Sequence, residues 1–183
     1  MKLSAFKKSK KYAWHFVGKT LRDGSPIPAD GVRLKFHDTP ILCEQGYHAS
    51  RQPFDALQFA PGETLCLVKI GGKVIEDTDK LVCTERTILA RFDATEMLRY
   101  FSRMQGIAAL EYWDTEPPCV VLDYLATGDE ELRAAARDAV RAAASDAAWD
   151  AAWDAARDAQ REHFNGLVYE CFAGPIENIR GEL

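Results

Sequence analysis

The sequence lacks the features of a membrane or exported protein. No apolar run in the 183 residues approaches the ~20 residues that a helix needs to cross a bilayer. The N-terminal stretch MKLSAFKKSKKYAWHF begins with lysines but has no apolar segment of the kind that follows them in a signal peptide. We therefore expect a cytoplasmic protein that makes no membrane contact.

Metal-binding patterns are also missing. The five cysteines show no CxxC pair and no histidine at the spacing of a zinc ligand. Two of them, Cys66 and Cys83, stand in apolar, strand-like runs, where a reduced thiol behaves as a small hydrophobic side chain. The sequence therefore predicts no metal site.

Charge is divided unevenly along the chain, although the net charge is only -5. Residues 1–93 contain 15 Lys and Arg against 11 Asp and Glu, whereas residues 94–183 contain 8 against 17. This split indicates two parts with different surfaces and argues against a protein that binds nucleic acid over its whole surface. The lysines near the N-terminus are typical of a solubilising terminus, so nucleic acid is not expected as the partner.

Periodicity assigns the two halves to different structures. Alternating and apolar runs predict strands over residues 12–17, 63–70, 73–77 and 80–92, with a turn at Gly71–Gly72 and a short helix from Pro53. Helical spacing then predicts a helix near residues 95–108, another that ends at Gly128, and a long alanine-rich helix over about 129–165 that Gly166 ends. The prediction is an α+β protein: an antiparallel, β-rich domain of residues 1–93 and a helical domain of residues 94–183.

A four-residue repeat marks the long helix. It places Asp146, Asp150 and Asp154 three residues before Trp149, Trp153 and Arg157. Tryptophans four residues apart lie on one face of a helix and bury a large area against whatever covers them. One interpretation is a bundle helix with a solvated acidic face, and the other is a docking surface for a protein partner. The carboxylate row also suggests mimicry of a phosphate backbone, and the alanines allow a homodimer through this helix.

The stretch CEQGYHAS, residues 43–50, has two interpretations. In the first, Gly46 makes a turn, His48 is structural, and Ser50 caps the helix that contains Pro53. In the second, Ser50 and the helix start bind an anion, and His15 and Glu85 complete a site if their strands are neighbours. Further ligand-binding residues would then be His48, Lys80 and Arg86.

Several stretches together resemble a family of uncharacterised proteins from phages and bacterial genomes. These are WHFVGKTLRDGSPIPADG, CEQGYHASRQPFDALQFAPG, DTDKLVCTERTILARFDATEMLR and the Ala/Trp/Asp/Arg tail. In that family a β-rich head precedes an alanine-rich helical tail of variable length. The resemblance covers nearly the whole chain and implies a phage or mobile-element accessory protein, without an established activity.

A looser resemblance links YAWHFVGKT and GYHASRQPFDALQFA to the ADP-ribosyltransferase pattern. It implies His15 as the ribose-orienting residue, Tyr47 as the nicotinamide-stacking residue, Ser50 as a supporting hydroxyl and Glu85 as the catalytic carboxylate. His48 interrupts the usual aromatic step, and Glu85 lacks the usual flanking signature. The activity implied is an NAD-using transfer.

We expect the protein to act by binding a host or viral protein in the host cytoplasm, for example as a counter-defence inhibitor. That interpretation requires no cofactor, and its partner-binding residues are Trp149, Trp153 and the three aspartates of the repeat. The first alternative is an ADP-ribosyltransferase-like enzyme with NAD as cofactor. The second is an acidic helix that imitates nucleic acid.

Overall fold

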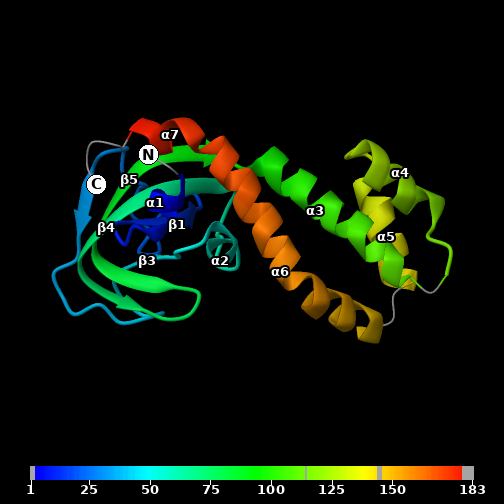
Figure 1. The fold of residues 1–183 in the computed structure, drawn as a ribbon, viewed down its shortest axis with the longest axis horizontal. Helices are drawn as coiled ribbons and strands as arrows, with labels where there is room; N and C mark the ends of the chain where they lie inside the picture. The colour runs from blue at the N-terminus through cyan, green and yellow to red at the C-terminus, as the bar shows by residue number, and fades with distance from the viewer. Residues whose placement is uncertain (1–2, 114, 144–145, 179–183) are drawn as a thin grey trace. The chain divides into compact units, whose positions relative to one another are not determined.

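The computed structural model describes residues 3–113, 115–143 and 146–178, without the side chains of residues 3–5, 112, 142–143 and 146–156. It is an α+β protein, as predicted, with an antiparallel sheet in the N-terminal half and helices after it (Figure 1). The chain divides into two compact units. The sheet unit comprises Met1–Thr95 and Phe164–Leu183, and the helical unit comprises Glu96–His163.

The sheet unit contains five strands, three helices and the end of a fourth helix among the described residues. Their bounds are α1 Leu3–Lys8, β1 Tyr12–Val17, β2 Arg33–Lys35, β3 Tyr47–Ala49, α2 Pro53–Leu57, β4 Thr64–Glu76, β5 Leu81–Asp93 and α7 Ala173–Asn178, with the last residues of α6 Asp146–Cys171. The predictions of a strand at 12–17 and a short helix from Pro53 are confirmed. In β1, aromatic side chains on one face alternate with mostly apolar side chains on the other, so both faces of the strand can be buried.

The sheet curls until β1 meets the end of β3. All strand pairs are antiparallel, in the order β1-β4-β5-β2, and β3 also pairs with β5. Beyond β3, Ser50 forms a bridge with Trp14 of β1, with one backbone hydrogen bond in each direction at 2.8 and 2.9 Å. The sheet therefore has an inner face, directed toward its own strands, and an outer face.

The outer face is covered by aromatic side chains of helices. The Trp14 ring lies 5.0 Å from Phe172 and 5.8 Å from Tyr169 between ring centroids, both edge-on, and Phe6 of α1 stacks on Tyr12. Edge-to-face pairs at these distances add roughly 0.5–1.5 kcal/mol each to the gain from burial. This cluster fixes α1 and the end of α6 against β1.

The predicted turn at Gly71–Gly72 is wrong, because β4 is a single strand that continues to Glu76. The register with β5 shifts between Gly71 and Val74, which is a β-bulge. Gly72 adopts a φ of +68°, and an added Cβ would lie 2.0 Å from Thr84 Oγ1, which accepts a hydrogen bond from the Lys73 N–H at 2.9 Å. The two glycines bend a strand that the sequence pattern alone would end.

The predicted end of the long helix at Gly166 is also wrong. Helix α6 continues through Gly166 to Cys171, and its last turns bury Phe164, Val168 and Tyr169 in the sheet unit. A Cβ at Gly166 would meet nothing within 4 Å. The glycine is therefore a tolerated interior residue, and the apolar spacing after it decides where the helix ends.

The helical unit contains the other helices. Among the described residues these are α3 Thr95–Ala109, a short 3₁₀ turn Leu110–Tyr112, α4 Cys119–Thr127, α5 Arg133–Ala143 and the first part of α6. The predicted helix near 95–108 and the predicted end at Gly128 are confirmed. Val121, Leu125 and Ala136 join α4 and α5 in a small apolar core.

The long helix predicted from Asp129 begins later. The Asp129 carboxylate accepts a hydrogen bond from the Glu131 N–H at 2.9 Å, residues 130–132 form a turn, and α5 starts at Arg133. Helix α6 starts at Asp146, and residues 144–145 lie outside the described part of the chain. None of the described helices is long and apolar enough to cross a bilayer. The division into domains 1–93 and 94–183 stays a prediction, because compact units do not test independent folding.

Gly46 offers a test of the sheet's packing. Its φ is +105°, and an added Cβ would lie 2.7 Å from Val82 Cγ2 and 3.1 Å from Pro40 Cβ. Gly46→Ala combines the cost of a left-handed backbone with overpacking, so we expect a loss of about 2–5 kcal/mol in the free energy of unfolding. Gly24, with a φ of +83° and nothing within 4 Å, is the matched control, and Gly24→Ala should lose only about 1–2 kcal/mol. Urea unfolding followed by circular dichroism measures both, and equal losses would contradict the packing at Gly46.

Candidate functional site

The inner face of the sheet carries most of the residues that the sequence singles out. Its apolar cluster comes from strands and one loop, with no helical residue among its members: Ala13, Val17, Ala49, Cys66, Val68, Ile70, Leu81, Cys83 and Ile88, with Ile27, Tyr47 and Val74 against it. The strands therefore bury this face against one another, which the closure between β1 and β3 permits. Polar groups on this face are desolvated by the sheet itself.

Arg86 is the one buried cation of this face among the described residues. It pairs with Ile70 across β4 and β5, and only 4% of its surface is exposed. Its Nη1 donates to the His48 carbonyl at 2.7 Å, and its Cζ lies 5.3 Å from the centre of the Tyr47 ring. The Nε has no hydrogen-bond partner, and burial lowers the pKa of Arg86. The guanidinium thus connects β5 with β3 through the interior.

His15 lies on β1 between the inner-face residues Ala13 and Val17. It is the one residue of β1 that keeps an intermediate share of its accessible surface, whereas the other five are buried. Burial first, then the charge of Arg86 and of His48, lowers its pKa well below the ordinary value. His15 is therefore neutral near pH 7 and lies close enough to Arg86 to sense its charge.

His48 holds the turn that precedes β3. Its Nε2 accepts a hydrogen bond from the Cys43 N–H at 2.9 Å, and Cys43 has a φ of +65°. The Arg22 Nη1 donates to the Cys43 carbonyl at 2.8 Å from the other side. Burial and the nearby Arg22 and Arg86 lower the pKa of His48, which keeps Nε2 free to accept. His48 therefore holds this turn in place.

Ser50 does not cap the following helix, so that prediction is wrong. It is 1% exposed, and its backbone pairs with Trp14. The N-cap of α2 is Gln52, and the Phe54 N–H is satisfied by Asn165 Oδ1 at 2.9 Å. The sequence gives no signal for Asn165, because its partner lies 111 positions earlier in the chain.

The remaining candidates have other contacts. Tyr47 donates its hydroxyl to the Lys35 carbonyl at 3.3 Å, and burial raises its pKa. Glu85 forms an ion pair with Arg33 at 3.5 Å, and Lys80 lies 4.0 Å from Asp79 and over the Phe59 ring. The structure thus brings together His15, Tyr47, His48 and Arg86, and it places Glu85 and Lys80 against different partners.

The predicted partner-binding residues lie outside the described side chains. Helix α6 includes Asp146, Trp149, Asp150, Trp153 and Asp154, but the structure describes their backbone only as part of a helix. Their role as a docking surface stays a prediction.

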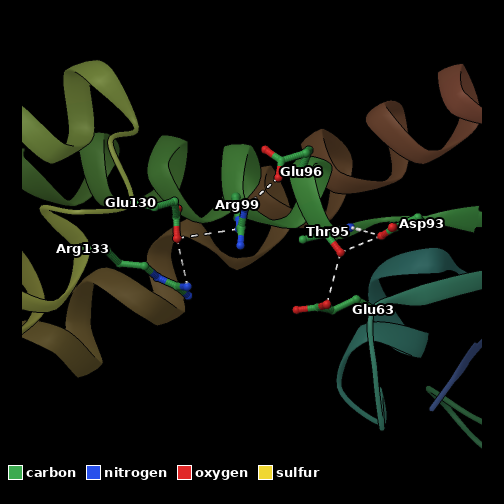
Figure 2. A network of polar contacts seen from close by, with 7 residues as sticks. All are labelled: Glu63, Asp93, Thr95, Glu96, Arg99, Glu130 and Arg133. Atoms are coloured by element: carbon green, nitrogen blue, oxygen red, sulfur yellow. Dashed lines mark hydrogen bonds and ion pairs between the residues drawn. The ribbon is translucent and has the colours of Figure 1, made fainter. Parts of the chain in front are cut away.

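A second polar group lies where β5 meets α3. The Thr95 hydroxyl donates to Asp93 Oδ1 at 2.6 Å and lies 3.1 Å from Glu63 Oε2 (Figure 2). The hydrogen bonds from Thr95 lower the pKa of Asp93, which also accepts the Thr95 N–H at the start of the helix. These residues line a pocket of ≈ 340 Å³ with Val17, Gly18, Lys19, Pro61, Gly62 and Thr64. Within the described parts of the chain, no group of three or more His, Cys, Asp or Glu could hold a metal ion.

On the helical unit, Figure 2 shows a separate ion-pair chain. Arg99 contacts Glu96 at 2.7 Å and Glu130 at 3.8 Å, and Arg133 contacts Glu130 at 3.4 Å. The side chains are 38–83% exposed, and exposed pairs of this kind each contribute roughly 0–1 kcal/mol. This chain links α3 to the start of α5 and is structural.

In a comparison with known proteins, a family model matches part of the chain. Residues 30–100 match the family described as Domain of unknown function (DUF7666). The match includes β2, β3, β4 and β5 and therefore His48, Glu85 and Arg86, whereas His15 precedes it. No curated protein and no solved structure matches the chain. Over these residues the chain is similar to an uncharacterised family. The phage origin, the alanine-rich tail and the ADP-ribosyltransferase resemblance stay predictions.

Thiol reactivity tests whether the inner face is closed. Cys66 and Cys83 are 0% exposed, and burial raises the pKa of each to about 11, so only about 0.1% of either is thiolate at pH 8. We expect iodoacetamide to label Cys43 and Cys119, which are exposed, and to spare Cys66 and Cys83 until urea unfolds the protein. Peptide mass spectrometry of native and unfolded samples measures this. Labelling of Cys66 in the native protein at the rate of Cys43 would show that the inner face opens.

Proposed function

We propose that the protein acts by binding another protein, as an accessory factor of a phage or mobile element, and that its sheet unit is a scaffold. This proposal rests on one observation: the polar side chains that the sequence singles out make contacts within the fold. His48, Tyr47 and Glu85 contact Cys43, Lys35 and Arg33. Ser50 joins β1 to the end of β3 through its backbone.

Each of these contacts has a structural consequence. The His48 bond holds the left-handed Cys43, the Tyr47 bond joins β3 to the end of β2, and the Ser50 pair closes the sheet. A hydrogen bond inside a protein contributes roughly 0.5–1.5 kcal/mol, and an unsatisfied buried partner costs roughly 1–3 kcal/mol. Freeing these groups for chemistry would therefore cost stability, which supports a scaffold.

The contact surface that we propose is the repeat at the start of α6. A 26-residue helix carries it, and the other end of that helix is fixed in the sheet unit by Phe164, Val168 and Tyr169. Tryptophans at positions 149 and 153 lie one turn apart, and tryptophan is enriched among the residues that dominate binding energy. The aspartates at 146, 150 and 154 would favour a partner with a basic rim.

Replacing both tryptophans tests the surface. The Trp149→Ala, Trp153→Ala double variant should lose capture of its partner from a lysate of the parent host by about tenfold or more, because two anchors are removed. Affinity capture with quantitative mass spectrometry measures the loss. The control variant is Ile107→Ala, Leu122→Ala, which removes two exposed apolar side chains of the helical unit and should keep capture. A large fall in the melting temperature of the tryptophan variant would show that the indoles are core, against the proposal.

The second candidate is NAD-dependent transfer, favoured by the gathering of His15, Tyr47 and Arg86 on the inner face. The scaffold proposal predicts no NAD binding by calorimetry at millimolar ligand, because Glu85 contacts Arg33 and side chains of the strands fill the inner face on which His15 lies. Glu85→Gln should leave partner capture unchanged. The opposite result would be NAD turnover that Glu85→Gln abolishes and that the exposed control Glu44→Gln keeps. It would contradict the scaffold proposal and support the transferase.

A further inference from the structure

A buried arginine without an acidic partner is the most unusual electrostatic feature of the sheet unit. No hydrogen bond or ion pair joins Arg86 to an Asp or Glu among the described residues, and its Nη1 bond goes to a neutral carbonyl. The Nε is buried and unpaired. Removing a charge from water costs several kcal/mol unless an opposite charge and further hydrogen bonds compensate it. The site therefore has an unmet positive charge and an unmet donor.

The other groups around Arg86 do not supply the missing negative charge. Burial raises the pKa of Cys66 and Cys83 to about 11 and also raises that of Tyr47, so all three are protonated near pH 7. His15 and His48 are neutral at that pH, because burial lowers the pKa of each. The inner face thus offers donors and one fixed positive charge.

The junction of β1 and β3 brings His15 toward this region. The His48 carbonyl that holds Arg86 lies two residues before Ser50, which pairs with Trp14, and His15 follows Trp14. His15 keeps accessible surface within an otherwise buried strand, and no hydrogen bond to its ring is found within the described part of the chain. The accessible part of His15 is therefore the point from which a small ligand would approach the guanidinium.

We propose that His15 and Arg86 form a binding site for a small oxyanion, a phosphate or a short carboxylate. The guanidinium offers the free Nε to an anionic oxygen, and charge-assisted hydrogen bonds of this type are roughly twice as strong as neutral ones. The imidazole of His15, on the inner face of β1, supplies a second donor. Because Arg86 is 4% exposed, the site accepts a small anion or the end group of a larger molecule, and excludes cations by charge.

The test compares anions at constant ionic strength. The melting temperature of the full chain should rise by about 3 °C or more with 50 mM inorganic phosphate or with 50 mM acetate, relative to chloride, through linkage. A response to phosphate alone identifies phosphate chemistry, and a response to acetate alone identifies a carboxylate. Arg86→Met, which fills the same space without a charge, should lose the response. The control Arg91→Met removes a partly exposed arginine of the same strand and should keep it.

Phosphate also stabilises proteins non-specifically. The test is therefore whether the rise in melting temperature is lost in Arg86→Met and kept in Arg91→Met. No response to either anion, or an equal response in Arg86→Met, overturns the site. If Arg86→Met does not fold, NMR of the histidine rings in the unaltered chain replaces it. Bound anion should shift the His15 signals and raise the pKa of His15. The NMR signals of His37 and His163 should not move. His15 signals that do not respond to phosphate or acetate overturn the proposal.

Discussion

The pair of hydrogen bonds between Trp14 and Ser50 is the constraint on which the sheet unit depends. It joins β1 to the end of β3 and gives the sheet an inner face that its own strands bury. The Trp14 side chain lies on the outer face of the sheet, where its ring packs on Tyr169 and Phe172. One residue therefore closes the sheet and attaches the C-terminal helix to it. The backbone pair contributes only about 1–3 kcal/mol, so aromatic burial on the outer face must supply the larger share.

Closure explains why polar residues from distant parts of the sequence meet. His15, Tyr47 and Arg86 come from β1, β3 and β5. Side-chain alternation places them on one face, and the curl of the sheet brings β1 near β3. Desolvation on that face lowers the pKa of both histidines and of Arg86, and raises that of Tyr47 and the two thiols. All these shifts favour neutral groups, which is the response expected of an interior without a counter-charge. The guanidinium stays charged because the pKa of arginine starts so high.

The elements that the sequence predicts correctly are those that local periodicity determines. Strand 12–17, the helix from Thr95 and the end of α4 at Gly128 all follow from side-chain spacing and end residues. Three of the failures, at Gly71–Gly72, Gly166 and Ser50, lie where a contact from a distant segment overrides the local signal. Thr84 holds the bulge, the sheet unit buries the last turns of α6, and Trp14 takes the backbone of Ser50.

The candidate site shows the same limit. Its residue types were visible in the sequence, but burial of Arg86 was not, since Glu85 and Arg86 look alike in a strand until the register places Arg86 opposite Ile70. A core that contains a charged arginine gives up stability, because an apolar side chain of similar volume often does as well or better. Sites that break the rule of an apolar or fully satisfied core are where function is expected. By this reasoning the buried Arg86 marks where a function of the sheet unit is expected.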